Sequence, residues 1–166
     1  PIMGRNRLWR DMIVDAIESD PAWKGGDYTA QPQDGLRTAA DILAIAGSAP
    51  HQMQAELPDQ AAVDKRLHDL VANALRDDDA NDLIYQLNAS RDYDPSARLE
   101  TIKARVLWIN SADDFINPPE LGIAQREAAR LKNGRFVLIP IGPTTHGHGT
   151  HTWAVNWKAQ LAELLA

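Results

Sequence analysis

Apolar residues in the first 90 positions of the chain recur every three or four residues, which is the spacing of an amphipathic helix. The clearest case is the segment 5–19, whose apolar positions are Leu8, Met12, Ile13, Ala16 and Ile17. The same spacing predicts helices over residues 36–46, from about 59 to 75, and over 80–90. Asp59 stands where the N-cap of the third helix would be. We therefore expect the first part of the chain, residues 1–95, to be mostly helical.

The pattern changes after Pro95. Residues 105–110 and 135–140 are short apolar runs rich in β-branched and aromatic residues, which are typical of buried strands. A helix is predicted between them, from Pro119 to about residue 131, and a last one over residues 151–165. Residues 96–166 thus read as a βαβα unit, in which the length of the connection predicts parallel strands and a right-handed crossover.

Two parallel strands do not make a sheet that is stable in water, because parallel strands are normally buried on both faces and flanked by further strands. No segment before residue 96 has the pattern of an additional strand. The fold class we predict is therefore α/β, specifically the C-terminal half of a doubly wound protein whose sheet is completed elsewhere.

Composition narrows the classes of function. The 166 residues carry 17 Lys and Arg against 23 Asp and Glu, a formal net charge of −6, which argues against nucleic acid or an anionic membrane as a partner. No apolar run approaches the length of a spanning helix, so we expect a soluble protein, in the cytoplasm or the periplasm. With no cysteine, thiolate metal sites and cysteine nucleophiles are excluded.

Candidate catalytic groups follow both predicted strands. Asp113 and Asp114 come after the first strand, and His146, His148 and His151 come after the second. In open parallel sheets, functional groups collect beyond the carboxyl ends of the strands. A carboxylate that accepts a hydrogen bond from one imidazole nitrogen orients the ring, while the other nitrogen takes a proton from a nucleophile. The pattern indicates two members of a nucleophile–acid–histidine triad.

Two other interpretations fit the same residues. The Asp pair could form a turn or cap the helix that follows, since Asp favours both positions. The three histidines with a nearby Asp could ligate zinc. Residue types and spacing alone leave the triad and the metal site open.

Several segments resemble the homoserine O-acetyltransferase family of α/β-hydrolases, in the order in which that family has them. They are Gly4-Arg5-Asn6-Arg7, residues 20–28 with 35–39, residues 79–85, and residues 99–104 leading to the first strand and its acid loop. The resemblance spans nearly the whole chain. It implies an α/β-hydrolase in which residues 1–95 hold a post-strand helix and a helical cap, and residues 96–166 hold the C-terminal part of the core.

The resemblance also implies roles for single residues. Asp114 begins a segment similar to the D-x-I-x-P pattern of the acid loop, and His148 follows glycine as the histidine of the superfamily does. Asp113 and His151 are the alternative acid and base. Aromatic residues of the cap, such as Trp23, Tyr28 and Tyr85, could line a substrate pocket, although aromatic residues at helical spacing belong more often to a core.

The nucleophile implied by the resemblance is a serine in a Gly-x-Ser-x-Gly elbow. No such motif occurs here, where the serines are Ser19, Ser48, Ser90, Ser96 and Ser111. We therefore expect the serine to come from an N-terminal half or a companion chain. Two origins fit this expectation: proteolytic processing that leaves a heterodimer, or a chain that is a fragment of a longer protein.

The function predicted from the sequence is serine-dependent acyl-enzyme chemistry on a small ester or amide, with no metal and no cofactor. Acetyl transfer from acetyl-CoA to homoserine is the first alternative. It is weakened because Gln86-Leu87-Asn88 stands where the acetyltransferases carry a cap arginine. A metal-dependent hydrolase and a non-catalytic binding module are the remaining alternatives.

Overall fold

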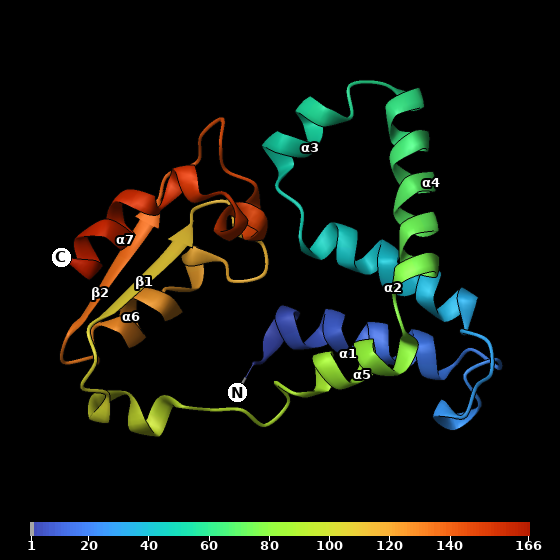
Figure 1. Ribbon diagram of the computed structural model, residues 1–166, viewed down its shortest axis with the longest axis horizontal. Coiled ribbons are helices and arrows are strands. Elements are labelled where there is room, and N and C mark those ends of the chain that lie inside the picture. The colour runs from blue at the N-terminus through green and yellow to red at the C-terminus, as the bar shows by residue number, and fades with distance from the viewer. Residues whose placement is uncertain (1) are drawn as a thin grey trace. The chain divides into compact units, whose positions relative to one another are not determined.

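The computed structural model describes residues 2–166, so Pro1 lies outside the description. The chain forms two compact units (Figure 1). The first contains the residues up to 46 together with 56–93, and the second contains residues 47–55 and 94–166.

The first unit is a bundle of four α-helices: α1 (Gly4–Glu18), α2 (Gln33–Ala46), α4 (Gln60–Asp77) and α5 (Ala80–Asn88). Helix α1 packs against α2 and α5, and α2 packs against α4 (Figure 1). Ile13, Ile17 and Leu36 are fully buried in this core. Helices α1 and α2 approach closely at Gly35, where a Cβ would lie 2.8 Å from the Cα of Ile17. The helices predicted from apolar spacing are confirmed here, including the Asp59 cap, whose carboxylate accepts from the N–H of Ala62.

The loop between α1 and α2 contains a short 3₁₀ helix, Lys24–Gly26, and is hydrogen-bonded to the start of α5. The Asp79 carboxylate caps α5 and accepts a 2.7 Å hydrogen bond from the Tyr28 hydroxyl. The Trp23 indole donates to the side-chain oxygen of Asn81 at 3.0 Å. Hydrogen bonds from Tyr28 and Gln31 lower the pKa of Asp79 and keep it ionised as an acceptor. Trp23 and Tyr28 therefore fix this loop.

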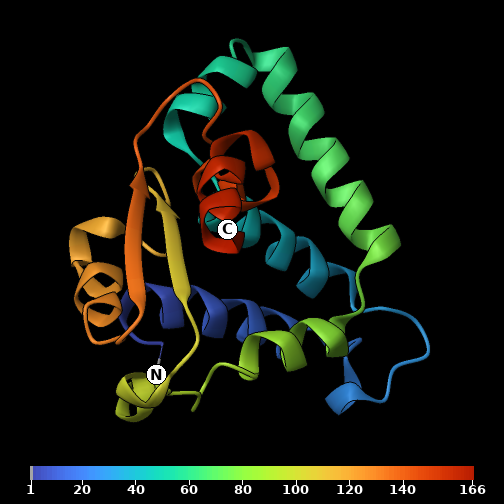
Figure 2. The same cartoon turned by 60° about the vertical axis from the view of Figure 1, so that its left-hand side comes forward.

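The second unit contains a parallel strand pair, β1 (Val106–Ser111) and β2 (Gly134–Ile139). Val106 lies opposite Gly134 and Ser111 opposite Ile139, so both carboxyl ends finish at the same edge. Helices α6 (Ile123–Ala128) and α7 (Lys158–Leu165) lie on opposite faces of the pair (Figure 2). The remaining elements are α3 (Pro50–Glu56) and the 3₁₀ helices Ser96–Thr101, Pro119–Leu121, Gly147–Thr152 and Ala154–Asn156. The predicted strands and their parallel pairing are confirmed.

Two helix predictions in this part of the chain are wrong, and one helix was missed. The helix predicted to begin at Pro119 is broken at Gly122, which has a left-handed φ of +63°. The helix predicted to begin at residue 151 starts at Lys158, because Thr152 and Asn156 use their side chains to hydrogen-bond nearby main-chain carbonyls in 3₁₀ turns. Helix α3 was not predicted at all. It begins at Pro50, since proline is tolerated in the first turn of a helix.

The sheet is only partly covered. Within residues 2–166 it has two strands, and the apolar residues of β1 from Val106 to Ile109 are half-buried. Leu138 of β2 is 43% exposed. Parallel strands in folded proteins are usually flanked on both faces and both edges. Among the described helices, none combines the length and the apolar character needed to cross a membrane.

Candidate active site

The acid loop directly follows β1 and holds Asp114 in a fixed orientation. Asp114 Oδ1 accepts hydrogen bonds from the N–H of Ile116 at 2.8 Å and the N–H of Asn117 at 2.9 Å. The residue is only 5% exposed. Because Oδ1 is taken by these two main-chain donors, Oδ2 is the oxygen that remains for a third partner.

That partner is His148, from the loop after β2. Its Nδ1 lies 3.1 Å from Asp114 Oδ2. A carboxylate can only accept, so Nδ1 carries the proton and Nε2 holds the lone pair of the neutral ring. The His148 side chain is 38% exposed, and Nε2 has no hydrogen bond to any residue within 2–166. The structure therefore brings together the two residues that the sequence singled out.

The ionisation of Asp114 suits an acceptor. Burial by itself raises the pKa of its carboxyl, but the hydrogen bonds from His148 and from the N–H groups of Asn117 and Ile116 outweigh that effect and lower the pKa. Asp113, the alternative acid, faces different partners. Burial raises its pKa as well, and hydrogen bonds from Ser111, Thr145 and the N–H of Gly147 bring it below the usual value. Asp113 thus binds the loops to each other, whereas Asp114 binds the imidazole.

Gly147 allows the histidine loop to approach the acid loop. Its φ is +55°, and a Cβ would lie 3.0 Å from the Ser48 carbonyl oxygen and 3.3 Å from that of Asp113. A side chain at this position is strained by the backbone conformation and would meet main-chain atoms that cannot move aside. The glycine before His148 is therefore a steric requirement of the site.

We expect Gly147→Ala to lower kcat of the native protein about tenfold or more, because it strains the backbone by about 1–2 kcal/mol and shifts His148 away from Asp114. Gly149→Ala is the matched control. The nearest atom to a Cβ there is His146 Cβ at 3.7 Å, an ordinary contact, and the variant should retain most of the activity. Steady-state kinetics of both variants test this, and equal losses would contradict it.

The other two histidines of the cluster point to different partners. The His146 ring stacks on Trp153 with centroids 3.9 Å apart. His151 Nδ1 is 2.6 Å from the main-chain oxygen of His148. Over residues 2–166, no three His, Cys, Asp or Glu side chains are arranged to hold a metal ion together. The three imidazoles do not converge as the zinc interpretation requires.

Two contacts of this site were not foreseen from the sequence. One is the His151–His148 hydrogen bond. The other is Asn117, whose side-chain Nδ2 lies 3.5 Å from His148 Nδ1 while its N–H donates to Asp114. Asn117 immediately precedes Pro118 in the acid loop, and only its place three residues after Asp114 hinted at a capping contact.

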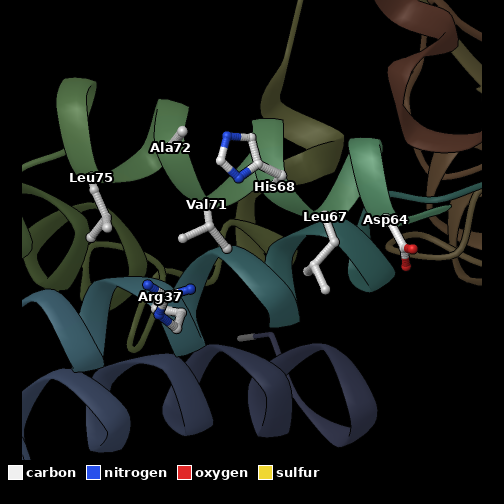
Figure 3. Close-up of a pocket in the computed structure, with 7 residues that line it drawn as sticks. All are labelled: Arg37, Asp64, Leu67, His68, Val71, Ala72 and Leu75. Atoms are coloured by element: carbon white, nitrogen blue, oxygen red, sulfur yellow. The ribbon is translucent and has the colours of Figure 1, made fainter. Parts of the chain in front are cut away.

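A separate cavity of about 460 Å³ lies between α2 and α4 in the first unit (Figure 3). Arg37, Asp64 and His68 are its polar residues, and its apolar lining is Leu67, Val71, Ala72 and Leu75. It contains no serine, cysteine or lysine that could act as a nucleophile. Tyr85, the third aromatic considered for a pocket, does not line it and is 74% exposed.

Comparison with known proteins connects this geometry to a fold. The structure superposes on homoserine O-acetyltransferase from Bacillus anthracis with a TM-score of 0.78, covering 99% of this chain and 50% of that chain at 20% identity. It superposes on an acetylester hydrolase from Corynebacterium glutamicum with a TM-score of 0.76, covering 98% and 50% at 19% identity. The chain has part of an α/β-hydrolase fold.

The partial α/β-hydrolase fold predicted from the sequence is thus confirmed, and the chain spans about half the length of the solved structures that it matches. In sequence, 67 residues, 40% of this chain, are 42% identical to "Putative carbamate hydrolase RutD" of Caulobacter segnis and cover 23% of that protein. No family model matches the chain. The similarity to the solved structures shows the fold alone.

Proposed function

We propose that this chain supplies the acid and the base of a serine-dependent α/β-hydrolase, which cleaves an ester or amide through an acyl-enzyme intermediate. The observation that carries the proposal is the 3.1 Å contact between His148 Nδ1 and Asp114 Oδ2, made by the loops that follow two neighbouring parallel strands. The acetylester hydrolase of Corynebacterium glutamicum and RutD of Caulobacter segnis, both named as hydrolases, support the same class of reaction.

In the proposed reaction, His148 Nε2 takes the proton of the serine hydroxyl as the serine oxygen attacks the acyl carbonyl. The imidazolium then gives that proton to the leaving alcohol or amine, and the bond between it and the acyl group breaks. In the second half of the cycle, His148 takes a proton from water as the water oxygen attacks the acyl carbonyl. The imidazolium then returns this proton to the serine oxygen as the bond between the serine and the acyl group breaks, which releases the acid and restores the hydroxyl. Asp114 stays ionised throughout, because its lowered pKa favours the carboxylate.

The serine in this proposal lies outside the 166 residues, in a preceding segment of the same protein or in a companion chain. Ser111, the serine nearest to the acid along the chain, is 4% exposed, and its hydroxyl donates a hydrogen bond to Asp113. Additional strands from the serine-bearing segment would also pair the free edge of the sheet and cover its half-exposed apolar residues.

Acyl transfer is the second candidate, because homoserine O-acetyltransferase is among the structures that share the fold. The same acyl-enzyme serves both reactions, and only the acceptor differs. Gln86 and Asn88 in α5 replace the arginine expected of the acetyltransferases, so we favour water as the acceptor.

The proposal predicts burst kinetics. The native assembly, mixed with a chromogenic acetyl ester, should release about one equivalent of phenolate per site quickly and then turn over more slowly, since fast acylation by an activated ester is followed by slower deacylation. Activity should survive treatment with a metal chelator. A steady rate from time zero that a chelator abolishes and zinc restores would instead support the metal-dependent alternative. Adding homoserine tests acyl transfer in the same experiment, because transfer would accelerate the slow phase and yield the acetylated amino acid.

A further inference from the structure

We propose that His151 is a positioning residue for His148, which holds the main chain of the base while Asp114 holds its ring. The proposal rests on the function proposed above and extends it to a residue whose hydrogen bonds within residues 2–166 go to His148 and Trp157 and not to Asp114. Its basis is the 2.6 Å contact between His151 Nδ1 and the carbonyl oxygen of His148.

The chemistry of this contact fixes the tautomer of His151. A carbonyl oxygen can only accept, so Nδ1 of His151 must carry a proton. Protonation of the whole ring leaves that N–H in place, so the contact persists whether the ring is neutral or charged. The hydrogen bond from His151 therefore holds the His148 carbonyl in place.

The turn that carries His148 depends on such hydrogen bonds because little of it is buried. In the 3₁₀ helix Gly147–Thr152, only Gly147 and Thr150 are buried, and α7, which follows, has no buried residue. The indole N–H of Trp157 donates to the His151 carbonyl at 3.0 Å and fixes His151 in turn. Segments with few buried contacts open locally at low cost, so loss of the hydrogen bond from His151 to the His148 carbonyl should allow His148 to move.

The geometry makes His151 a poor substitute for the base itself. A base that orients through a carboxylate gains stabilisation of its imidazolium from the negative charge. His151 Nδ1 faces an uncharged carbonyl, and its ring is tilted by 56° to that of His148 with centroids 5.2 Å apart. The contact holds His148 in place without offering a second acid–base pair.

The test is a set of substitutions at His151, some of which keep a hydrogen-bond donor near the position of Nδ1 and some of which remove it. In His, Nδ1 is bonded to Cγ, and in Asn the amide nitrogen is also bonded to Cγ, whereas in Gln it is one bond farther out. His151→Asn can therefore keep the donor near its present place, and His151→Gln and His151→Ala cannot. The control is Thr152→Val, which removes the 2.9 Å hydrogen bond from Thr152 Oγ1 to the Gly149 carbonyl in the same turn without touching His148.

The readout is the rate at which a fluorophosphonate labels the native assembly. We expect His151→Ala and His151→Gln to label about tenfold more slowly, and His151→Asn and Thr152→Val to stay within about threefold of the unmodified protein. If His151→Asn labels as slowly as His151→Ala, or if Thr152→Val is equally slow, the positioning role is wrong. If His148→Ala abolishes labelling and His151→Ala has no effect, this inference fails while the proposed function stands.

A second measurement does not depend on the serine. Nitrogen-15 NMR of histidine-labelled native assembly, with the His148 signals assigned by comparison with His148→Gln, reports the Nδ1–H that faces Asp114. This proton signal should broaden or disappear in His151→Ala and persist in His151→Asn. An unchanged signal in His151→Ala would overturn the inference even if no serine were labelled.

Discussion

His148→Ala is expected to reduce kcat of the native assembly by about four to six orders of magnitude while leaving the folded structure intact. The expectation follows from the role of Nε2, because without an imidazole nothing removes the proton of the nucleophile or protonates the leaving group. The half-exposed ring contributes little to the core, so the thermal unfolding temperature should change only slightly. Steady-state hydrolysis of an acetyl ester and a calorimetric scan of the same preparation measure both quantities.

The matched control for His148 is His146→Ala. His146 belongs to the same cluster but stacks on Trp153 and does not face Asp114. Its loss should lower kcat by less than about tenfold. Comparable losses in the two variants would mean that the cluster acts as a unit, as in a metal site, and would contradict the assignment of the base to His148.

Asp114→Asn should cost about 10³–10⁴ in kcat, and the hydrogen bonds of the site explain why. The Ile116 and Asn117 N–H groups require an oxygen at the Oδ1 position, so the new amide must place its oxygen there. Its NH₂ group then faces His148 Nδ1 and donates to it. The His148 proton moves to Nε2, which can no longer accept a proton from the nucleophile.

Asp113→Asn is the control for this change, since Asp113 bonds Ser111 rather than the imidazole. We expect a loss of less than about tenfold, and a loss as large as that of Asp114→Asn would move the acid to Asp113.

The pH dependence of the free energy of unfolding adds a second check on Asp114. Because the folded state lowers the pKa of Asp114, its contribution to stability is present above the pKa of the unfolded carboxyl, about 4, and is lost as the pH falls through the folded value. The difference in the free energy of unfolding between the unmodified protein and Asp114→Asn should therefore shrink as the pH falls through the folded value of the Asp114 pKa.

The proximity of Asp114 and His148 could be predicted from the sequence because the positions of both residues follow from simple rules. Two β-branched runs separated by a helical connection give parallel strands, and groups that follow such strands meet at one edge. Asp114 and His148 lie 34 positions apart in the chain, and this rule alone brings them together. The resemblance then selected them over Asp113 and His151.

Other features depend on contacts that cannot be predicted from a pattern of residue types. Helix α3 was not predicted, and its first position is occupied by Pro50, because proline is tolerated in the first turn of a helix. The 3₁₀ turns before Lys158 replace a helix because Thr and Asn side chains compete for main-chain carbonyls. The hydrogen bond from His151 to the His148 carbonyl and the cavity between α2 and α4 can be seen only in the packed structure. Both depend on the positions that the main chain takes in the folded protein.

The most direct test of the account is to find where a covalent acyl-enzyme inhibitor attaches. The native assembly is labelled with a fluorophosphonate, digested, and the adduct located by mass spectrometry, in parallel with the His148→Ala variant. The proposed mechanism predicts one adduct on a serine outside these 166 residues, present in the unmodified protein and lost in the variant. An adduct on a serine of this chain, such as Ser48, or labelling that is as fast without His148, would contradict it.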